Sequence, residues 1–388
     1  MTNGVEDDVF GQLVETVDRF ARQRLIPAEK RVEQEDNIPE EIVSEMKEMG
    51  LFGLSTPEEF GGIGLSVPQE ARLIETLCYA SLTFRSLIGT NVGIGAQGIV
   101  MDGTPDQKER WLPGIASGDI IASFALTEPD NGSDAGGIRT SARRDGTDFV
   151  INGTKRYITN AVRAGVFTVF ARTDPDKPGA DGVSAFIIPA DTPGITVATP
   201  DKKMGQRGTK TSDVIFEDVR VPESAILGGP EKLNMGFRTA MKVLDRGRIH
   251  VSAMAVGQSQ RMLDIATDYA LERTQFGKPI GQHQLVQGLI ADCQAELQAA
   301  RALVRAAADT FHREGKAILE AASAKYFCTE AAGRIADRAV QIHGGAGYMS
   351  EYDIERLYRD IRLLRIYEGT SQIQQLIIAR RTLAQRAG

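Results

Sequence analysis

The spacing of apolar residues changes twice along the chain, and these two changes constrain the fold more than any other feature of the sequence. Up to about residue 120, apolar side chains recur at the spacing of amphipathic helices. Short β-branched runs split by Gly, Pro and Asp follow, and helical spacing then returns to the end of the chain. This order predicts an α+β fold with an N-terminal helical domain (1–120), a small antiparallel β domain (121–229) and a C-terminal helical bundle (230–388).

The same patterns predict individual elements. The apolar residues of 10–21 predict a helix that ends at Pro27, because a proline inside a helix removes a hydrogen bond. Asn152-Gly153 predicts a tight turn between two strands, 149–151 and 157–159. Further helices are expected over 40–49, 67–82, 89–100, 105–112, 234–272, 282–312, 316–341, 351–360 and 371–385.

Charge and cysteine content exclude several classes of protein. The chain has 45 basic and 52 acidic residues, a net charge of −7, so a nucleic-acid partner is not expected. No apolar run reaches the roughly 18 residues of a membrane span, so no membrane insertion is expected. Three scattered cysteines (Cys78, Cys293 and Cys328) indicate a reducing compartment. Since residues 1–8 are acidic rather than basic, no signal peptide is predicted and a cytoplasmic location is expected.

Motifs for metal and dinucleotide binding are missing from the sequence. The four histidines (His250, His283, His312 and His343) are scattered and no HExxH or paired-cysteine spacing occurs, so no metal site is expected. The glycine-rich segment 343–348 follows a predicted helix rather than a strand, which excludes a dinucleotide-binding fold. Its glycines indicate close backbone approach to a ligand or to a neighbouring helix.

One carboxylate near the C-terminus has the surroundings of a catalytic base. Glu368 precedes Gly369, and Ser371 with Gln374 matches a capping box, so a helix is predicted to begin near Ser371. The glycine allows close approach of a ligand, and the helix start offers free N–H groups. Proton removal next to a carbonyl requires a carboxylate beside such donors. The alternative is a glutamate that interacts only with the helix dipole.

Two further stretches are candidate ligand sites. Residues 124–134 combine Pro, Gly and short polar side chains at the junction of the helical and β blocks, where ligands often bind; a capped loop is the alternative. Residues 273–284 place Arg273 between two helices, where it can bind a phosphate or simply end a helix.

Taken together, these stretches resemble the FAD-dependent acyl-CoA dehydrogenase family over essentially the whole chain. Six motifs occur in the family's order, and they lie at 126–134, 152–160, 244–248, 273–278, 341–348 and 366–373. The resemblance implies oxidation of an acyl-CoA thioester between Cα and Cβ to the trans-2-enoyl-CoA. It implies that Glu368 removes the α-proton, that the β-hydrogen leaves as hydride to flavin N5, and that an electron-transfer flavoprotein takes the electrons. Some relatives place the base at the position of Gly247 instead, which leaves Glu368 as the base in this chain.

The resemblance also assigns binding residues. It implies a flavin site at the β domain formed by Phe124, Leu126, Thr127, Ser133, Tyr157 and Thr159. It implies that the flavin pyrophosphate and ribose contact Arg273, Phe276, Gln284, Gln341, Gly344 and Gly345 of a neighbouring subunit, and that the adenylate end contacts Thr370 and Gln372. The acyl-CoA substrate is expected to contact Ser133, Asp245, Arg248 and Gly369. A cofactor shared between chains implies a homo-oligomer, usually a tetramer built on the C-terminal bundle.

An arginine in the N-terminal block points to the acyl group. Arg85 lies in an aromatic-Arg-Ser sequence 42 residues before Thr127. Glutaryl-CoA dehydrogenases carry the same sequence at this spacing, and there the Arg binds the distal carboxylate of the substrate. The resemblance therefore implies a dicarboxyl or otherwise anionic acyl group. In the alternatives, Arg85 pairs with a protein carboxylate such as Glu75 or reaches solvent. Cys78 replaces the acidic residue that those enzymes carry seven positions earlier, which leaves decarboxylation open.

Two other functions fit the same sequence. An acyl-CoA oxidase or a flavin monooxygenase on this fold would differ in letting O2 reach the reduced flavin. A non-catalytic helical binding protein would keep the fold without the chemistry.

Overall fold

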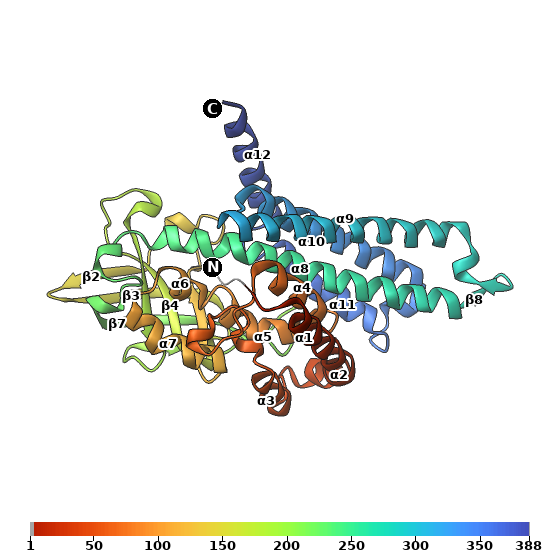
Figure 1. Cartoon of the computed structure of the whole chain (residues 1–388), viewed down its shortest axis with the longest axis horizontal. Coiled ribbons are helices and arrows are strands. Elements are labelled where there is room, and N and C mark those ends of the chain that lie inside the picture. Colours follow the sequence, from red (N-terminus) through yellow and green to blue (C-terminus); the bar gives the residue numbers. More distant parts are fainter. Residues whose placement is uncertain (1–3, 388) are drawn as a thin grey trace.

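The computed structural model describes residues 4–387, so the first three residues of the acidic N-terminal segment lie outside it. Helices, then a sheet, then long helices follow one another along the chain (Figure 1), and the predicted α+β fold is confirmed. The sheet occupies one end of the molecule, the long helices extend to the other end, and the N-terminal helices lie against the middle (Figure 1). No helix in the described range has the length and apolar character needed to cross a membrane.

Seven helices form the N-terminal part of the described chain: α1 (Asp7–Phe20), α2 (Ile26–Glu35), α3 (Glu40–Glu48), α4 (Val67–Leu77), α5 (Leu82–Val92), α6 (Gln97–Asp102) and α7 (Pro105–Ser117). The expected stop at Pro27 is wrong. A π turn (Ala21–Leu25) joins α1 to α2, and Pro27 lies in the first turn of α2, where a missing N–H is tolerated.

The expected helices over 67–82 and 89–100 are also wrong in their bounds. The chain breaks after Leu77, and α5 begins at a cap in which the Ser81 hydroxyl accepts from the Thr83 N–H at 3.4 Å. It breaks again at Gly93, before α6. The resulting separate helix, α5, carries Arg85.

The middle of the chain forms a seven-stranded sheet in the order β1-β4-β2-β3-β7-β6, with β5 on β4. Most pairs are antiparallel, as expected, but β1 and β2 each run parallel to β4. The strands are β1 (Ile121–Ala125), β2 (Ser141–Asp145), β3 (Asp148–Thr159), β4 (Ala164–Arg172), β5 (Val183–Pro189), β6 (Ile195–Val197) and β7 (Thr211–Pro222).

The expected turn at Asn152-Gly153 is wrong, because β3 continues through it. The register against β7 shifts between Ile151 and Gly153, as in a β-bulge. The Asn152 amide donates to Asp218 Oδ1 at 3.0 Å, and its oxygen accepts from the Asp218 N–H at 2.9 Å. These bonds between β3 and β7 satisfy the Asn152 side chain within the sheet, so the chain does not need to turn there.

The C-terminal helices match the prediction to within two residues: α8 (Gly236–Glu272), α9 (Gln284–Glu314), α10 (Ile318–His343), α11 (Asp353–Ile361) and α12 (Ser371–Ala387). A short hairpin of β8 (Thr274–Gln275) and β9 (Lys278–Pro279) joins α8 to α9 at the far end of the bundle (Figure 1). Residues 246–259 of α8 are buried without interruption. Every side chain of this stretch, charged or not, is therefore removed from bulk water.

Asn160 joins the β domain to α5. Its side-chain amide donates to the carbonyls of Ser86 at 3.1 Å and Leu87 at 3.0 Å and to the Thr90 hydroxyl at 2.9 Å. Because Asn160 directly follows β3, these bonds fix the position of the helix that carries Arg85 relative to the sheet.

A buried ion pair holds the junction loop between β1 and β2. Glu128 accepts from Lys155 Nζ at 2.8 Å and from the backbone N–H groups of Arg139 at 2.6 Å and Thr140 at 2.8 Å. Lys155 Nζ also donates to the Leu126 carbonyl at 3.1 Å. Burial alone would raise the pKa of Glu128, but Lys155 and the backbone donors lower it to about 2. The loop is thus fixed by a carboxylate that stays charged.

Lys155→Met should lower the free energy of unfolding by about 3 kcal/mol at neutral pH, because it leaves Glu128 buried without its cation. Urea denaturation followed by circular dichroism measures this change. Lys177→Met is the matched control, since Lys177 forms an exposed pair with Asp174 at 3.4 Å and its loss should change stability by less than about 0.5 kcal/mol. Equal effects of the two substitutions would contradict the structural role of the buried pair.

Candidate functional site

Glu368 lies on a strained turn just before α12. Both Glu368 (φ 53°) and Gly369 (φ 90°) have left-handed backbone conformations, which a glutamate adopts only when its surroundings hold it there. The Gly369 carbonyl accepts from Lys325 Nζ at 2.7 Å and from Gln374 Nε2 at 3.0 Å. The turn is therefore held in place by one residue of α10 and one residue of α12.

The expected capping box at Ser371 is wrong. Thr370 Oγ1 accepts from the Ile373 N–H at 3.3 Å, so Thr370 caps α12. The Ser371 hydroxyl instead donates to Glu330 at 2.5 Å. Gln374 reaches back to the carbonyls of the turn rather than to the N–H of the cap.

The carboxylate of Glu368 packs into the space that Gly247 of α8 leaves open. A Cβ at position 247 would lie 2.1 Å from Glu368 Oε2, so any larger residue there would displace the carboxylate. This oxygen is buried without a hydrogen-bond partner. The backbone N–H of Glu368 also bonds to no group in the described part of the chain. A buried acceptor without a partner is costly unless a ligand satisfies it, and the N–H of the same turn offers such a ligand a donor.

Three cations surround this carboxylate. Burial raises the pKa of Glu368, and the charges of Arg85, Lys325 and Arg248 oppose the rise. Lys325 is fully buried, and burial lowers its pKa to about 8. Burial likewise lowers the pKa of Arg248, whose Nη1 lies 2.5 Å from Asp245 Oδ1 while its Nε is buried without a partner. The result is a carboxylate whose pKa lies above the ordinary value, so that it is a stronger base than an exposed glutamate.

Lys325 was missed by sequence reasoning, although the sequence holds a signal for it. On α10 it shares a face with Ala321, Ala322 and Cys328, all of which are buried. A lysine in an apolar stripe of a helix is almost never buried without a partner.

Arg85 is buried at the end of the same region, 5% exposed. Its guanidinium lies against Gly89 of the same helix, where a Cβ would come within 2.6 Å of Nη1. Nη2 lies 3.2 Å from His250 Nδ1, and Nε has no partner. No ion pair joins Arg85 to a carboxylate within residues 4–387. Glu75, the expected alternative partner, instead binds Arg301 at 2.7 Å.

Cys78 lies close enough to Arg85 for the cation to influence the thiol. Burial raises the pKa of Cys78 to about 12, and the charge of Arg85 only partly opposes the rise. The thiol is therefore neutral at physiological pH and contributes no negative charge to Arg85.

The residues predicted to face the flavin ring do come together at the β domain. Ser123 Oγ donates to the Thr159 carbonyl at 2.8 Å, and the Arg156 N–H donates to the Thr127 carbonyl at 2.8 Å. With the bond from Lys155 to the Leu126 carbonyl, these contacts bring the ends of β1 and β3 side by side. Phe124 packs on Phe170, Ser133 lies exposed in the loop, and Tyr157 is 58% exposed at a positive φ of 58°.

The residues predicted to hold the pyrophosphate lie elsewhere, at the far end of the bundle. All of them are exposed: Arg273, Phe276, Gln284, Gln341, Gly344 and Gly345. The Tyr269 ring stacks on His343 at 4.4 Å, which brings the ends of α8 and α10 together. The 26 residue steps from Gly247 along α8 to its C-cap Arg273 span about 39 Å. One chain therefore does not bring this group to Glu368, whereas Thr370 and Gln372 adjoin it.

The bundle end nevertheless suits a large aromatic ligand with a diphosphate. Phe276 is 93% exposed, and Arg273 supplies a planar donor group close by. A Cβ at Gly344 or Gly345 would meet nothing within 4 Å, so the backbone here is open to close approach. These features fit the expected FAD.

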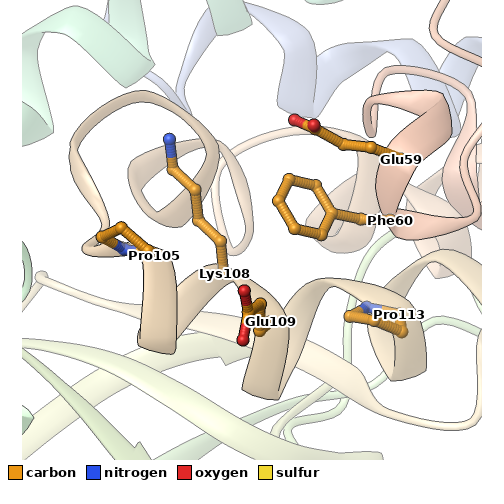
Figure 2. Close-up of a pocket in the computed structure, with 6 residues that line it drawn as sticks. All are labelled: Glu59, Phe60, Pro105, Lys108, Glu109 and Pro113. Carbon is orange, nitrogen blue, oxygen red and sulfur yellow. The ribbon is translucent and has the colours of Figure 1, made fainter.

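A separate pocket of about 540 Å³ opens between the 3₁₀ turn Glu58–Phe60 and α7. Figure 2 shows its lining residues, Glu59, Phe60, Pro105, Lys108, Glu109 and Pro113. None of the predicted site residues lines it, so it is a feature of the N-terminal helices alone.

Comparison with known proteins identifies the family of the three domains. Models of the acyl-CoA dehydrogenase N-terminal, middle and C-terminal domains match residues 10–119, 123–219 and 234–383. A probable acyl-CoA dehydrogenase of Bacillus subtilis is 43% identical over 369 residues, 95% of this chain and 96% of the relative.

Two solved structures extend the likeness to the fold. Butyryl-CoA dehydrogenase of Megasphaera elsdenii has a TM-score of 0.93 and 34% identity, covering 99% of this chain and 100% of that one. A glutaryl-CoA dehydrogenase in complex with glutaryl-CoA has a TM-score of 0.92 and 33% identity, covering 99% and 97%. The chain therefore belongs to the acyl-CoA dehydrogenase family of FAD-dependent oxidoreductases.

Proposed function

We propose that Glu368 is the base of an α,β-dehydrogenation that converts an acyl-CoA thioester to the trans-2-enoyl-CoA. The observation that carries this proposal is the pair of unsatisfied groups on one turn, Glu368 Oε2 and the Glu368 N–H. The carboxylate takes the α-proton, and the N–H donates to the thioester oxygen where negative charge develops. When bound, FAD supplies the acceptor for the β-hydrogen, which leaves as a hydride.

The surrounding residues would orient the substrate and tune the base. Gly369 permits close approach of the thioester, while Arg248, Asp245 and Ser133 would line the coenzyme A arm. Lys325 donates to the Gly369 carbonyl at 2.7 Å and so holds the turn against α10. In this proposal an electron-transfer flavoprotein takes up the electrons, and the enzyme works in the cytoplasm, which the three buried, free cysteines favour.

Glu368→Gln should reduce the dehydrogenation rate roughly 10²- to 10⁴-fold, because it removes the base while keeping the shape of the side chain. The measurement is turnover of an acyl-CoA panel with ferrocenium as acceptor. The flavin absorbance and its shift on adding acyl-CoA serve as controls, and both should persist. A variant that keeps most of its activity would show that the base lies elsewhere.

We further propose that the active form is a homo-oligomer, a tetramer, in which each flavin is shared between chains. Arg273, Phe276, Gln284, Gln341, Gly344 and Gly345 of one chain would hold the pyrophosphate and ribose. The ring would lie against Phe124, Leu126, Thr127, Ser133, Tyr157 and Thr159 of another, with Thr370 and Gln372 near the adenylate. The roughly 39 Å of α8 between the Glu368 region and Arg273 supports this arrangement.

Co-expression of a Glu368→Gln chain with an Arg273→Glu chain should restore a substantial fraction of the activity that each variant lacks alone. Mixed oligomers contain sites that combine Glu368 of one chain with Arg273 of another. The activity of the purified, doubly tagged mixture measures this, and each single variant is the control. If both residues served one site within a single chain, the mixture would stay inactive.

We also propose that the substrate carries a second negative charge at the end of its acyl chain. Arg85 is buried, carries no ion pair with a carboxylate in the described chain, and keeps an unpaired Nε. Burying a cation without an anion is costly, and a substrate carboxylate would supply the anion.

Arg85→Ala should lower kcat/KM for glutaryl-CoA far more than for butyryl-CoA or valeryl-CoA. Valeryl-CoA has the same number of acyl carbons as glutaryl-CoA but lacks the second carboxylate, so it is the matched substrate. The expected loss on glutaryl-CoA is roughly 100-fold, the size of a lost charge-assisted bidentate contact. Equal losses on all three substrates would refute the anionic acyl group.

A further inference from the structure

Arg85 is one member of a fully buried group of four residues from three helices. Glu70 comes from α4, Arg85 from α5, and Arg246 and His250 from α8. Glu70 and His250 are 0% exposed, and Arg246 is 4% exposed. Glu70 Oε2 lies 3.1 Å from His250 Nε2 and also bonds to Arg246 Nη2. On the opposite side of the imidazole, His250 Nδ1 faces Arg85 Nη2 at 3.2 Å.

The partners of the imidazole determine which nitrogen carries the proton. Arg85 can only donate, so His250 Nδ1 must accept. His250 Nε2 faces two groups, the Glu70 carboxylate at 3.1 Å and Arg246 Nη1 at 3.3 Å. Because Nδ1 is bare, the one hydrogen of a neutral ring lies on Nε2, where the charged Glu70 can accept it. In a doubly protonated ring, the hydrogen on Nδ1 would point at the N–H donors of Arg85, which is unfavourable. Of the ring's protonation states, the neutral one with hydrogen on Nε2 satisfies the contacts with Arg85 and with Glu70.

The charges around the ring favour the same state. Burial lowers the pKa of His250; Glu70 opposes this, and Arg246 and Arg85 add to it. With a neutral imidazole, the four residues carry two positive charges and one negative charge. One positive charge therefore remains without an anion, and the only one of the two cations without a carboxylate partner is Arg85.

We propose that His250 is a positioning residue that sets the specificity of the acyl site, because it orients Arg85 toward an anionic acyl end. This inference rests on the proposed anionic substrate. Glu70 fixes the imidazole, the imidazole fixes Nη2, and the space at Gly89 accepts the rest of the guanidinium. The buried Nε, which has no partner, remains for the carboxylate of a dicarboxyl acyl group. Arg246 holds the C-terminal end of α5 through the Val92 carbonyl at 3.3 Å, which keeps the two helices in register.

The first test compares His250→Leu with His250→Gln on glutaryl-CoA and valeryl-CoA. Leucine removes the acceptor, whereas glutamine can accept from Arg85 through its oxygen and donate to Glu70 through its amide. His250→Leu should raise KM for glutaryl-CoA roughly 10- to 100-fold, with a much smaller change for valeryl-CoA and little change in kcat. His250→Gln should recover most of the loss. Equal losses on both substrates, or no recovery with glutamine, would overturn the assignment.

The second test reads the proton directly and needs no substrate. Solid-state NMR of the FAD-loaded enzyme labelled with nitrogen-15 histidine should show one ring, absent from His250→Gln, with hydrogen on Nε2 and a bare Nδ1. This ring should not titrate between about pH 5 and 8, where an ordinary histidine does. In Arg85→Ala the same ring should keep hydrogen on Nε2, because Glu70 still accepts from it, while the signal of Nδ1 should change because its donor is gone. A His250 ring with hydrogen on Nδ1, or one that titrates normally, would overturn the inference.

The two proposals fail in different ways. If wild type does not prefer glutaryl-CoA over valeryl-CoA, or if Arg85→Ala affects both equally, the anionic substrate is refuted. If that preference holds and Arg85→Ala abolishes it while His250→Leu leaves it intact, the anionic substrate survives and the role of His250 is refuted.

Discussion

The site depends on buried charged side chains near the middle of α8 that are not fully paired with opposite charges. Arg85, Arg248 and Lys325 approach Glu368 there, but none of them forms an ion pair with it within the described chain. A closed pair would lower the pKa of the carboxylate and end its use as a base, while an isolated carboxylate would be too costly to ionise. Cations at intermediate distance allow Glu368 to be both ionisable and basic. Gly247 makes this possible, because only a residue without a side chain leaves room for the carboxylate against α8.

Contacts with the rest of the fold stabilise the strained backbone of the site. Two consecutive left-handed residues would not persist at 368 and 369 without the bonds from Lys325 and Gln374 to the Gly369 carbonyl. The break after Leu77 has a similar effect, because it frees α5 to turn Arg85 toward α8, and Asn160 then fixes α5 to the sheet. The position of the site residues is thus fixed jointly by helices, a loop and a strand that are far apart in the sequence.

The sequence predicted long periodic elements and chemically distinctive residues well, and contacts between distant residues poorly. The five C-terminal helices and Glu368 on a turn before α12 follow from apolar spacing and from glycine. The prediction of a turn at Asn152-Gly153 was wrong because a β-bulge accommodates the same two residues. The prediction of a helix end at Pro27 was wrong because a π turn precedes it and a new helix begins there. The roles of Lys325 and of the group around His250 could not be predicted. Their partners lie up to 180 residues away in the sequence, and no local pattern specifies such contacts. For Arg85, the structure removes both alternatives that the sequence left open, because Glu75 binds Arg301 and the guanidinium is buried.

The buried surplus charge also bears on how sharply such a site can select its substrate. An apolar pocket discriminates between acyl chains by only about 1–3 kcal/mol per methylene, whereas a site built to bind a polar group can reject the analogue that lacks it by 10⁴–10⁵. The difference arises because the missing partner leaves buried polar atoms unsatisfied. Arg85 already carries such an atom, and the neutral His250 that orients it contributes no charge to replace a substrate anion. If His250 were a second carboxylate, Arg85 would be satisfied by the protein and the selectivity would vanish. A neutral acceptor is therefore the group that can hold an arginine in place and still leave its charge for the substrate.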